Sequence, residues 1–185
     1  IGSNGGKASL RNGASVSLLS ASVQRLDGNT YSGDINVYGS YIDPGSANIA
    51  QLLPGSYMAV NSAGRRVSLI SYGMLAIELE TNNGERLQLK EGKPATLRAP
   101  IPQDRIQSAP ATISMWYVDE TKGIWVEEGK ATKQGNEYVG TVNHFSFWNY
   151  DIDVPAVKLS LGLKNAAGNP IAGVPVRVTR LAGLG

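Results

Sequence analysis

The sequence lacks cysteine altogether and contains one histidine among its 185 residues. These absences exclude disulfide bonds, cysteine-ligated metals and metal sites built from several imidazoles. Oxygen ligands for Ca²⁺ remain, but the Asp151-x-Asp153 pair lacks the glycine and the distal glutamate of a calcium loop. We therefore expect no metal and no cofactor in this chain. The acidic residues interpreted as solvated loop acids are Asp34, Asp43, Asp119, Glu120, Asp151 and Asp153.

Strong charge and long apolar runs are also missing. The 17 basic and 15 acidic residues give a net charge of +2, and the largest basic cluster is the pair Arg65-Arg66. That pair is far too small for a nucleic-acid interface. No apolar run approaches the 18 residues that a membrane span needs, so we expect none in this segment.

The start at Ile1, without a signal-like segment, indicates a piece of a longer protein. The balance of Ser, Thr, Asn, Gln and Gly favours an exported, extracellular or cell-surface location.

The chain does contain many short alternating segments separated by turn residues. In Met74–Glu80, for example, apolar residues alternate with alanine and glutamate, and Asn82-Asn83-Gly84 predicts a hairpin directly after this segment. Short strands at this spacing predict an all-β fold, an antiparallel β-sandwich. From residue 57 onward the expected strands are Tyr57–Val60, Arg66–Ser71, Met74–Glu80, Arg86–Lys90, Lys93–Arg98, Thr112–Asp119, Gly123–Glu128, Lys130–Lys133 and Glu137–Asn149.

The composition changes near Asp153, so we expect a sandwich domain over residues 1–153 and a separate tail over 154–185. In the tail, Val157–Leu163 and Gly173–Val178 predict two strands around a turn at Asn165–Pro170. Two strands cannot form a core by themselves. The tail therefore packs on the first domain, opens a second domain or exchanges strands with a neighbouring copy.

The tail sequence Leu161–Val178 carries a family resemblance. Its hydrophobic strand, N-x-x-G-x-P-I turn and following G-V-P-V-R-V segment resemble the first hairpin of the carboxypeptidase regulatory-like sandwiches. In that family such Ig-like modules are non-catalytic spacers or stalks of exported bacterial proteins. The resemblance implies that the tail is the beginning of such a module.

A second resemblance lies in residues 114–151, which hold all three tryptophans, both phenylalanines and the only histidine. Trp116, Gly123-Ile124-Trp125, Glu128-Gly129 and Asn143–Ser146 resemble the GPS motif of GAIN domains, and the His-Phe-Ser triplet also resembles the self-cleaving FIIND domain. This chain departs from the GPS motif because it has none of the cysteines.

The wider region Tyr31–Asp151 resembles bacterial surface proteins and the extracellular region of cartilage intermediate layer protein. The shared features, apart from the Trp…Trp…His-Phe-Ser ending, are Tyr41-Ile42-Asp43-Pro44, Leu53-Pro54-Gly55 and Gly73-Met74-Leu75.

The His-Phe-Ser resemblance implies a β-sandwich with a tight kink at this triplet and, in self-cleaving relatives, breakage of the bond that corresponds here to Phe145–Ser146. The Ser146 hydroxyl would attack the Phe145 carbonyl, His144 would take its proton, and water would resolve the ester. The sequence shows no second titratable group placed to orient His144. The structural interpretation is a regular strand, in which alternation puts His144 and Ser146 on one face with Trp148.

The tryptophans also allow two interpretations. Trp116 and Trp148 fall on alternating strands, so we expect them in the core. Trp125 lies near a turn and is the candidate for an exposed carbohydrate-binding platform. We therefore expect a non-catalytic structural or adhesive module of an exported bacterial surface protein, with copies of itself, other surface proteins or glycans as partners. The alternatives are self-cleavage at Phe145–Ser146 and carbohydrate binding through Trp125 and nearby tyrosines.

Overall fold

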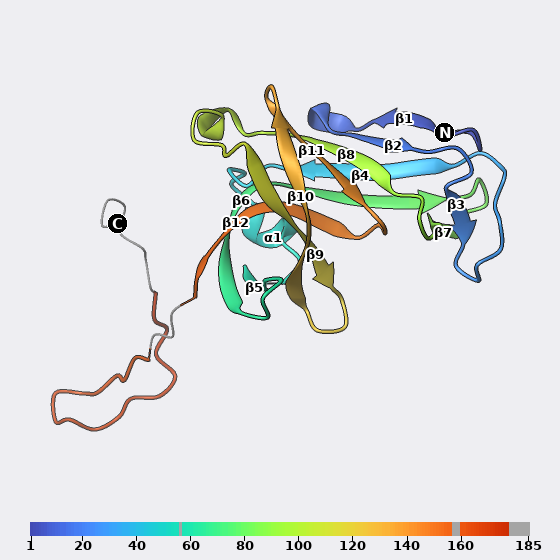
Figure 1. Cartoon of the computed structure of the whole chain (residues 1–185). Coiled ribbons are helices and arrows are strands. Elements are labelled where there is room, and N and C mark those ends of the chain that lie inside the picture. Colours follow the sequence, from blue (N-terminus) through green and yellow to red (C-terminus); the bar gives the residue numbers. More distant parts are fainter. Residues whose placement is uncertain (56, 157–159, 178–185) are drawn as a thin grey trace.

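The computed structural model describes residues 1–55, 57–156 and 160–177. Twelve strands form its sheet, and helical structure is limited to one α-turn and two 3-10 turns (Figure 1), so the predicted all-β sandwich class is confirmed. The strands are β1 (Gly6–Ser9), β2 (Ser15–Leu18), β3 (Val23–Arg25), β4 (Asn36–Ile42), β5 (Met58–Val60), β6 (Arg66–Glu80), β7 (Arg86–Leu89), β8 (Ala95–Pro100), β9 (Thr112–Asp119), β10 (Ile124–Gln134), β11 (Glu137–Val142) and β12 (Phe147–Pro155). The short helices are η1 (Arg11–Gly13), α1 (Ile49–Leu52) and η2 (Gln103–Arg105).

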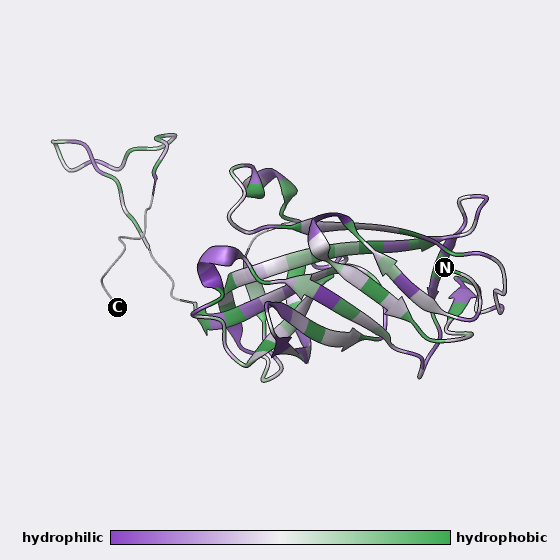
Figure 2. Ribbon diagram, turned by 90° about the horizontal axis from the view of Figure 1, so that it is seen from above, coloured by the Kyte–Doolittle hydropathy of each residue, from purple (hydrophilic) through white to green (hydrophobic). Residues whose placement is uncertain are grey.

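The sheet folds over on itself to enclose a large core. Its strands are hydrogen-bonded in the order β1-β2-β8-β11-β10-β9-β12-β6-β7-β3, with β4 joined to β6. Apolar side chains of β2, β8 and β11 pack in one cluster with those of β6 and β12, among them Val16, Leu97, Tyr138, Leu75 and Trp148. Along the strands hydrophobic residues alternate with hydrophilic ones (Figure 2), as expected when one face of a sheet meets the core and the other meets water.

A second, smaller core lies inside a closed ring of strands. β5 pairs in parallel with β10, where Trp125 is opposite Ala59, and antiparallel with β6, where Ala59 is opposite Val67. Since β10 also pairs with β9, β9 with β12 and β12 with β6, the pairing β5-β10-β9-β12-β6 returns to β5 as a small barrel. Buried in its cluster are Ile42, Ala59, Val67, Leu69, Met74, Trp116, Val118 and Trp125. Trp116 is therefore in the core, as predicted.

β6 is the longest strand and takes part in both cores. The predicted segments Arg66–Ser71 and Met74–Glu80 are joined into one strand of 15 residues. Between them, the register against β12 shifts at Asn149 and Asp151. Gly73 has a φ of +136°, and a Cβ there would lie 2.8 Å from the Tyr41 ring. Glycine therefore allows β6 to continue through this irregularity.

The predicted single strand Glu137–Asn149 is wrong, because the chain bends between β11 and β12. β11 pairs with β8 and β10, whereas β12 pairs with β6 and β9. A straight strand could not change both neighbours, so residues 143–146 carry the chain across. The bend is His144-Phe145-Ser146 with the preceding Asn143.

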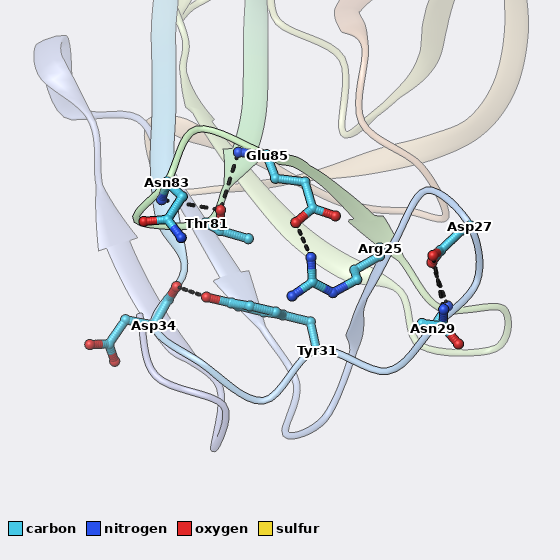
Figure 3. A network of polar contacts seen from close by, with 8 residues as sticks. All are labelled: Arg25, Asp27, Asn29, Tyr31, Asp34, Thr81, Asn83 and Glu85. Atoms are coloured by element: carbon cyan, nitrogen blue, oxygen red, sulfur yellow. Dashed lines mark hydrogen bonds and ion pairs between the residues drawn. The ribbon is translucent and has the colours of Figure 1, made fainter.

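The β3–β7 end of the sheet is held by polar contacts (Figure 3). Arg25 of β3 forms an ion pair with Glu85 and lies over the Tyr31 ring, 5.4 Å from its centre. The Tyr31 hydroxyl donates to the Asp34 carbonyl at 2.8 Å. The predicted hairpin at Asn82-Asn83-Gly84 joins β6 to β7, and Thr81 Oγ1 accepts the Glu85 amide at 3.1 Å within it.

The tail contains a well-formed turn with exposed side chains. Residues 160–177 are exposed throughout. Asn165 Oδ1 accepts the amides of Ala167 and Asn169 at 3.0 and 2.9 Å, and a single bridge pairs Lys164 with Pro170. The predicted strands Val157–Leu163 and Gly173–Val178 each lie partly outside the described residues. None of the described helices is long and apolar enough to cross a membrane.

Candidate functional site

The His-Phe-Ser bend is anchored by aromatic side chains. The Trp148 indole donates from Nε1 to the His144 carbonyl at 3.1 Å. The His144 ring stands edge-on to Tyr117, with ring centres 4.8 Å apart, and lies 5.0 Å from the Trp148 ring. Trp148 is fully buried, as predicted, so this hydrogen bond ties the bend to the large core.

Glu128 is a partner of His144 that sequence reasoning missed. Its Oε2 lies 3.4 Å from His144 Nε2, and the two side chains are 37% and 39% exposed. β10 has a register shift between Glu127 and Lys130, and Gly129 there has a φ of +81°. This bulge lets Glu128 face the bend while Glu127 accepts the Ser114 hydroxyl at 2.7 Å. The sequence placed Gly129 between two predicted strands, Gly123–Glu128 and Lys130–Lys133, but this division is wrong, because β10 runs through Gly129 as one strand. A glycine between two such segments was the available signal for the bulge.

Ser146 is not arranged as a nucleophile. Its hydroxyl donates to the Phe147 carbonyl at 3.1 Å, and in the described part of the chain no hydrogen bond joins it to His144. The backbone of the triplet is also ordinary: among the described non-glycine residues, positive φ angles occur at Asn12 and Ala21. The structure brings His144, Phe145 and Ser146 together at one bend and adds Glu128, but it shows neither a formed Ser–His pair nor backbone strain there.

The bend lines two hollows in the surface. The larger has a volume of about 630 Å³, and the smaller, about 480 Å³, shares with it the triplet and the charged residues Arg86 and Glu120. Apolar side chains of Leu26, Tyr38 and Phe147 line the larger hollow. Phe145 and Ser146, both half-buried, therefore line hollows that open to the surface.

Trp125 has no exposed face. It is fully buried in the barrel, and its Nε1 has no hydrogen-bond partner among the described residues. The expectation of an exposed sugar platform at Trp125 is wrong, because the ring closure through β5 places this residue inside. The turn that suggested exposure begins only after Asp119 and ends before Ile124.

A second group of polar side chains is buried beside the irregularity in β6. It consists of Ser71, Asn149 and Asp151. Ser71 Oγ donates to Asn149 Oδ1 at 2.7 Å, and Asn149 Nδ2 donates to Asp151 Oδ2 at 2.5 Å. Asn149 and Asp151 are 0% exposed and Ser71 is 4% exposed. The interpretation of Asp151 as a solvated loop acid is therefore wrong, because β12 extends through this residue and is paired on both sides.

Burial dominates the chemistry of Asp151. Removal from water raises the pKa of its carboxyl well above the usual range, and the Ser71 hydroxyl, the Arg105 charge and the Asn149 amide oppose this only in part. Its Oδ1 has no hydrogen-bond partner among the described residues. The nearby cation, Arg105, donates to the Ser71 carbonyl and lies over the Tyr72 ring.

Other acids cap turns. Asp43 Oδ1 accepts the Gly45 amide at 2.8 Å, and Asp119 Oδ2 accepts Lys122 Nζ at 2.7 Å. Hydrogen bonds from Lys122 and Thr121 lower the pKa of Asp119 to about 2. Within residues 1–55, 57–156 and 160–177, no group of three or more His, Cys, Asp or Glu side chains has the arrangement of a metal site.

These features define an all-β sandwich with an aromatic-anchored bend and a buried polar cluster at the join of its two cores. The chain is similar to cartilage intermediate layer protein 2 of Homo sapiens, with 28% identity over 119 residues. It is also similar to the protein of that name from Mus musculus, with 27% identity over 109 residues. These matches cover 64% and 59% of this chain but only 10% and 9% of the relatives, so the relation is distant and partial. No family model and no solved structure matches the chain.

Proposed function

We propose that this chain is a non-catalytic structural module of an exported surface protein. The observation that carries the proposal is the double closure of the fold, in which a sandwich core and a closed five-strand ring share β6 and β12. Such an arrangement covers most strand edges and resists separation of the strands from one another. The similarity to a protein named for a layer of cartilage supports an extracellular location. The resemblance of the tail to carboxypeptidase regulatory-like modules supports a place in a row of domains.

Force measurement on single molecules tests this role. When the full chain is pulled from its two ends, we expect a distinct force peak, because β12 lies between β6 and β9 and cannot leave without breaking both ladders. Extension without a resolved peak would contradict a load-bearing role. The matched comparison is Ala59→Pro, which removes a backbone donor from the strand that closes the ring and should lower the peak.

Self-cleavage at Phe145–Ser146 is the second candidate, favoured by the solvent-lined bend and by the Glu128–His144 pair. A carboxylate beside an imidazole is the arrangement that orients a general base, and His144 could then activate Ser146 after a rotation of the serine side chain. The observed Ser146 hydrogen bond to Phe147 supports the non-catalytic proposal instead.

Intact-protein mass spectrometry under denaturing conditions separates these two candidates. A non-catalytic module gives one uncut chain, whereas self-cleavage gives two fragments whose masses together exceed the chain by one water. In the second case, Ser146→Ala abolishes the fragments and Glu128→Gln slows their appearance. Ser108→Ala, an exposed serine on another loop, is the control that leaves either pattern unchanged.

A further inference from the structure

The buried cluster places a hydroxyl, an amide and a carboxyl in one line across two adjacent strands. Ser71 belongs to β6, and Asn149 and Asp151 belong to β12. The hydroxyl touches the amide oxygen at 2.7 Å, and the amide nitrogen touches the carboxyl at 2.5 Å. All three side chains are screened from water. The order is that of a nucleophile, an acyl group with its leaving nitrogen, and a proton-transfer group.

The irregularity in β6 accounts for the Ser71 hydroxyl but not for the buried carboxyl of Asp151. Ser71 Oγ accepts the Gly73 amide at 3.2 Å, so one small hydroxyl already satisfies the backbone there. A buried carboxyl with one oxygen lacking a partner in the described structure is unfavourable by comparison with an amide or an apolar side chain of similar size. The carboxyl of Asp151 therefore needs a reason beyond packing.

We propose that Ser71 and Asn149 form an intramolecular ester that joins β6 to β12, with Asp151 transferring the protons. The Ser71 Oγ–Asn149 Cγ bond forms, the Cγ–Nδ2 bond breaks, and ammonia leaves. The hydroxyl is already in contact with Oδ1, which is one bond from the Cγ it attacks.

Asp151 gives one proton and later receives another. Neutral Asp151 gives its proton through Oδ2 to the departing Asn149 nitrogen, with which that oxygen is in contact. The Ser71 hydroxyl gives its proton to Asn149 Oδ1, to which it already donates at 2.7 Å, and this proton passes to the Asp151 carboxylate when the ester carbonyl forms. The carboxyl is thus neutral again at the end, and the reaction needs no oxidant or external reactant. The raised pKa of Asp151 fits this role, because a neutral carboxyl has a proton to give.

The location suits a permanent cross-link. The chain has no cysteine with which to make a disulfide, and the ester would close a loop between residues 78 positions apart. Closing a long loop restricts the unfolded chain more than closing a short one. Exclusion of water from the cluster protects the ester from hydrolysis.

The mass of the full-length wild-type protein tests the proposal directly. We expect an uncut chain lighter than the sequence predicts by about 17 Da, the mass of one ammonia lost in the acyl transfer. Protease digestion should give one branched peptide that contains both Ser71 and Asn149, and hydroxylamine, which cleaves esters, should divide it. Full sequence mass in protein that has been incubated after folding overturns the proposal. A mass increase of about 1 Da, which marks hydrolysis of Asn149 to aspartate, overturns it equally.

Variants show which side chains take part in forming the ester. Ser71→Ala and Asp151→Asn should each have the full mass of their sequences, and Ser68→Ala, on the same strand, should still show the loss. A loss of ammonia that persists in Ser71→Ala overturns the assignment. Single-molecule extension gives an independent readout: residues 1–156 release about 500 Å when unlinked, but only about half of that when the 78-residue loop stays closed.

Discussion

Replacement of Trp125 by alanine lowers the free energy of unfolding by about 3–5 kcal/mol. The side chain is fully buried in the ring of strands and packs with Trp116, Met74 and Val118. Its removal leaves a cavity between strands whose hydrogen-bonded closure prevents them from collapsing inward. Chemical denaturation followed by circular dichroism measures the loss without relying on the fluorescence of the deleted residue.

Two comparisons sharpen this result. Tyr38→Ala removes an aromatic ring that is 54% exposed and should change stability by about 0.5 kcal/mol or less. Trp125→Phe should cost less than Trp116→Phe, because Trp125 Nε1 lacks a partner among the described residues, whereas Trp116 Nε1 donates to the Asp151 carbonyl at 3.2 Å. Equal losses from Trp125→Ala and Tyr38→Ala would contradict the closed barrel.

Stability falls as pH rises above about 5, with Asp151 as the principal cause. The carboxyl has a folded-state pKa well above the value of about 3.9 that it has in an unfolded chain. Below the unfolded value both states are protonated and the stabilising contribution is complete. As pH rises, the unfolded chain releases the proton first, and stability declines by up to about 1.4 kcal/mol per pH unit until the folded pKa is passed.

Urea unfolding between pH 5 and pH 9 measures this slope. Asp151→Asn, which keeps the size of the side chain without its ionisation, should flatten the profile. The control is Asp119→Asn, because hydrogen bonds lower the pKa of that partly buried carboxyl, so its titration affects stability only below about pH 4. The comparison concerns slopes, so a difference in absolute stability between variants does not affect it. An identical slope in wild type and Asp151→Asn would contradict a carboxyl that stays neutral in the folded state.

Local patterns predicted several strands and turns correctly. Alternation identified Met74–Glu80 and Thr112–Asp119, and Asn82-Asn83-Gly84 marked the β6–β7 hairpin. Alternation also placed Trp116 and Trp148 in the core. Each of these depends on residues close together in the chain, where the period of side chains and the backbone freedom of glycine carry the information.

The errors arose where distant strands decide the outcome. Trp125 looked peripheral because the strand that covers it, β5, precedes it by more than sixty positions. Asp151 looked like a loop acid because nothing near it signals pairing with both β6 and β9. Glu128 was missed as a partner of His144 because their approach depends on the bulge at Gly129 and on the bend after β11. Tertiary pairing therefore decides the positions of the candidate site residues.

The position of β12 between β6 and β9 also governs the order in which the protein can fold. As the chain leaves the ribosome, β6 is complete while its partner in β12 lies roughly 70 residues further along. Until that partner arrives, a long apolar strand has one open edge, the state in which nascent β proteins pair with each other. High sequence separation between partners makes the final insertion slow. A helper that covers β6 during synthesis, or a slower rate of synthesis, should therefore raise the yield of folded protein more than any change to its surface.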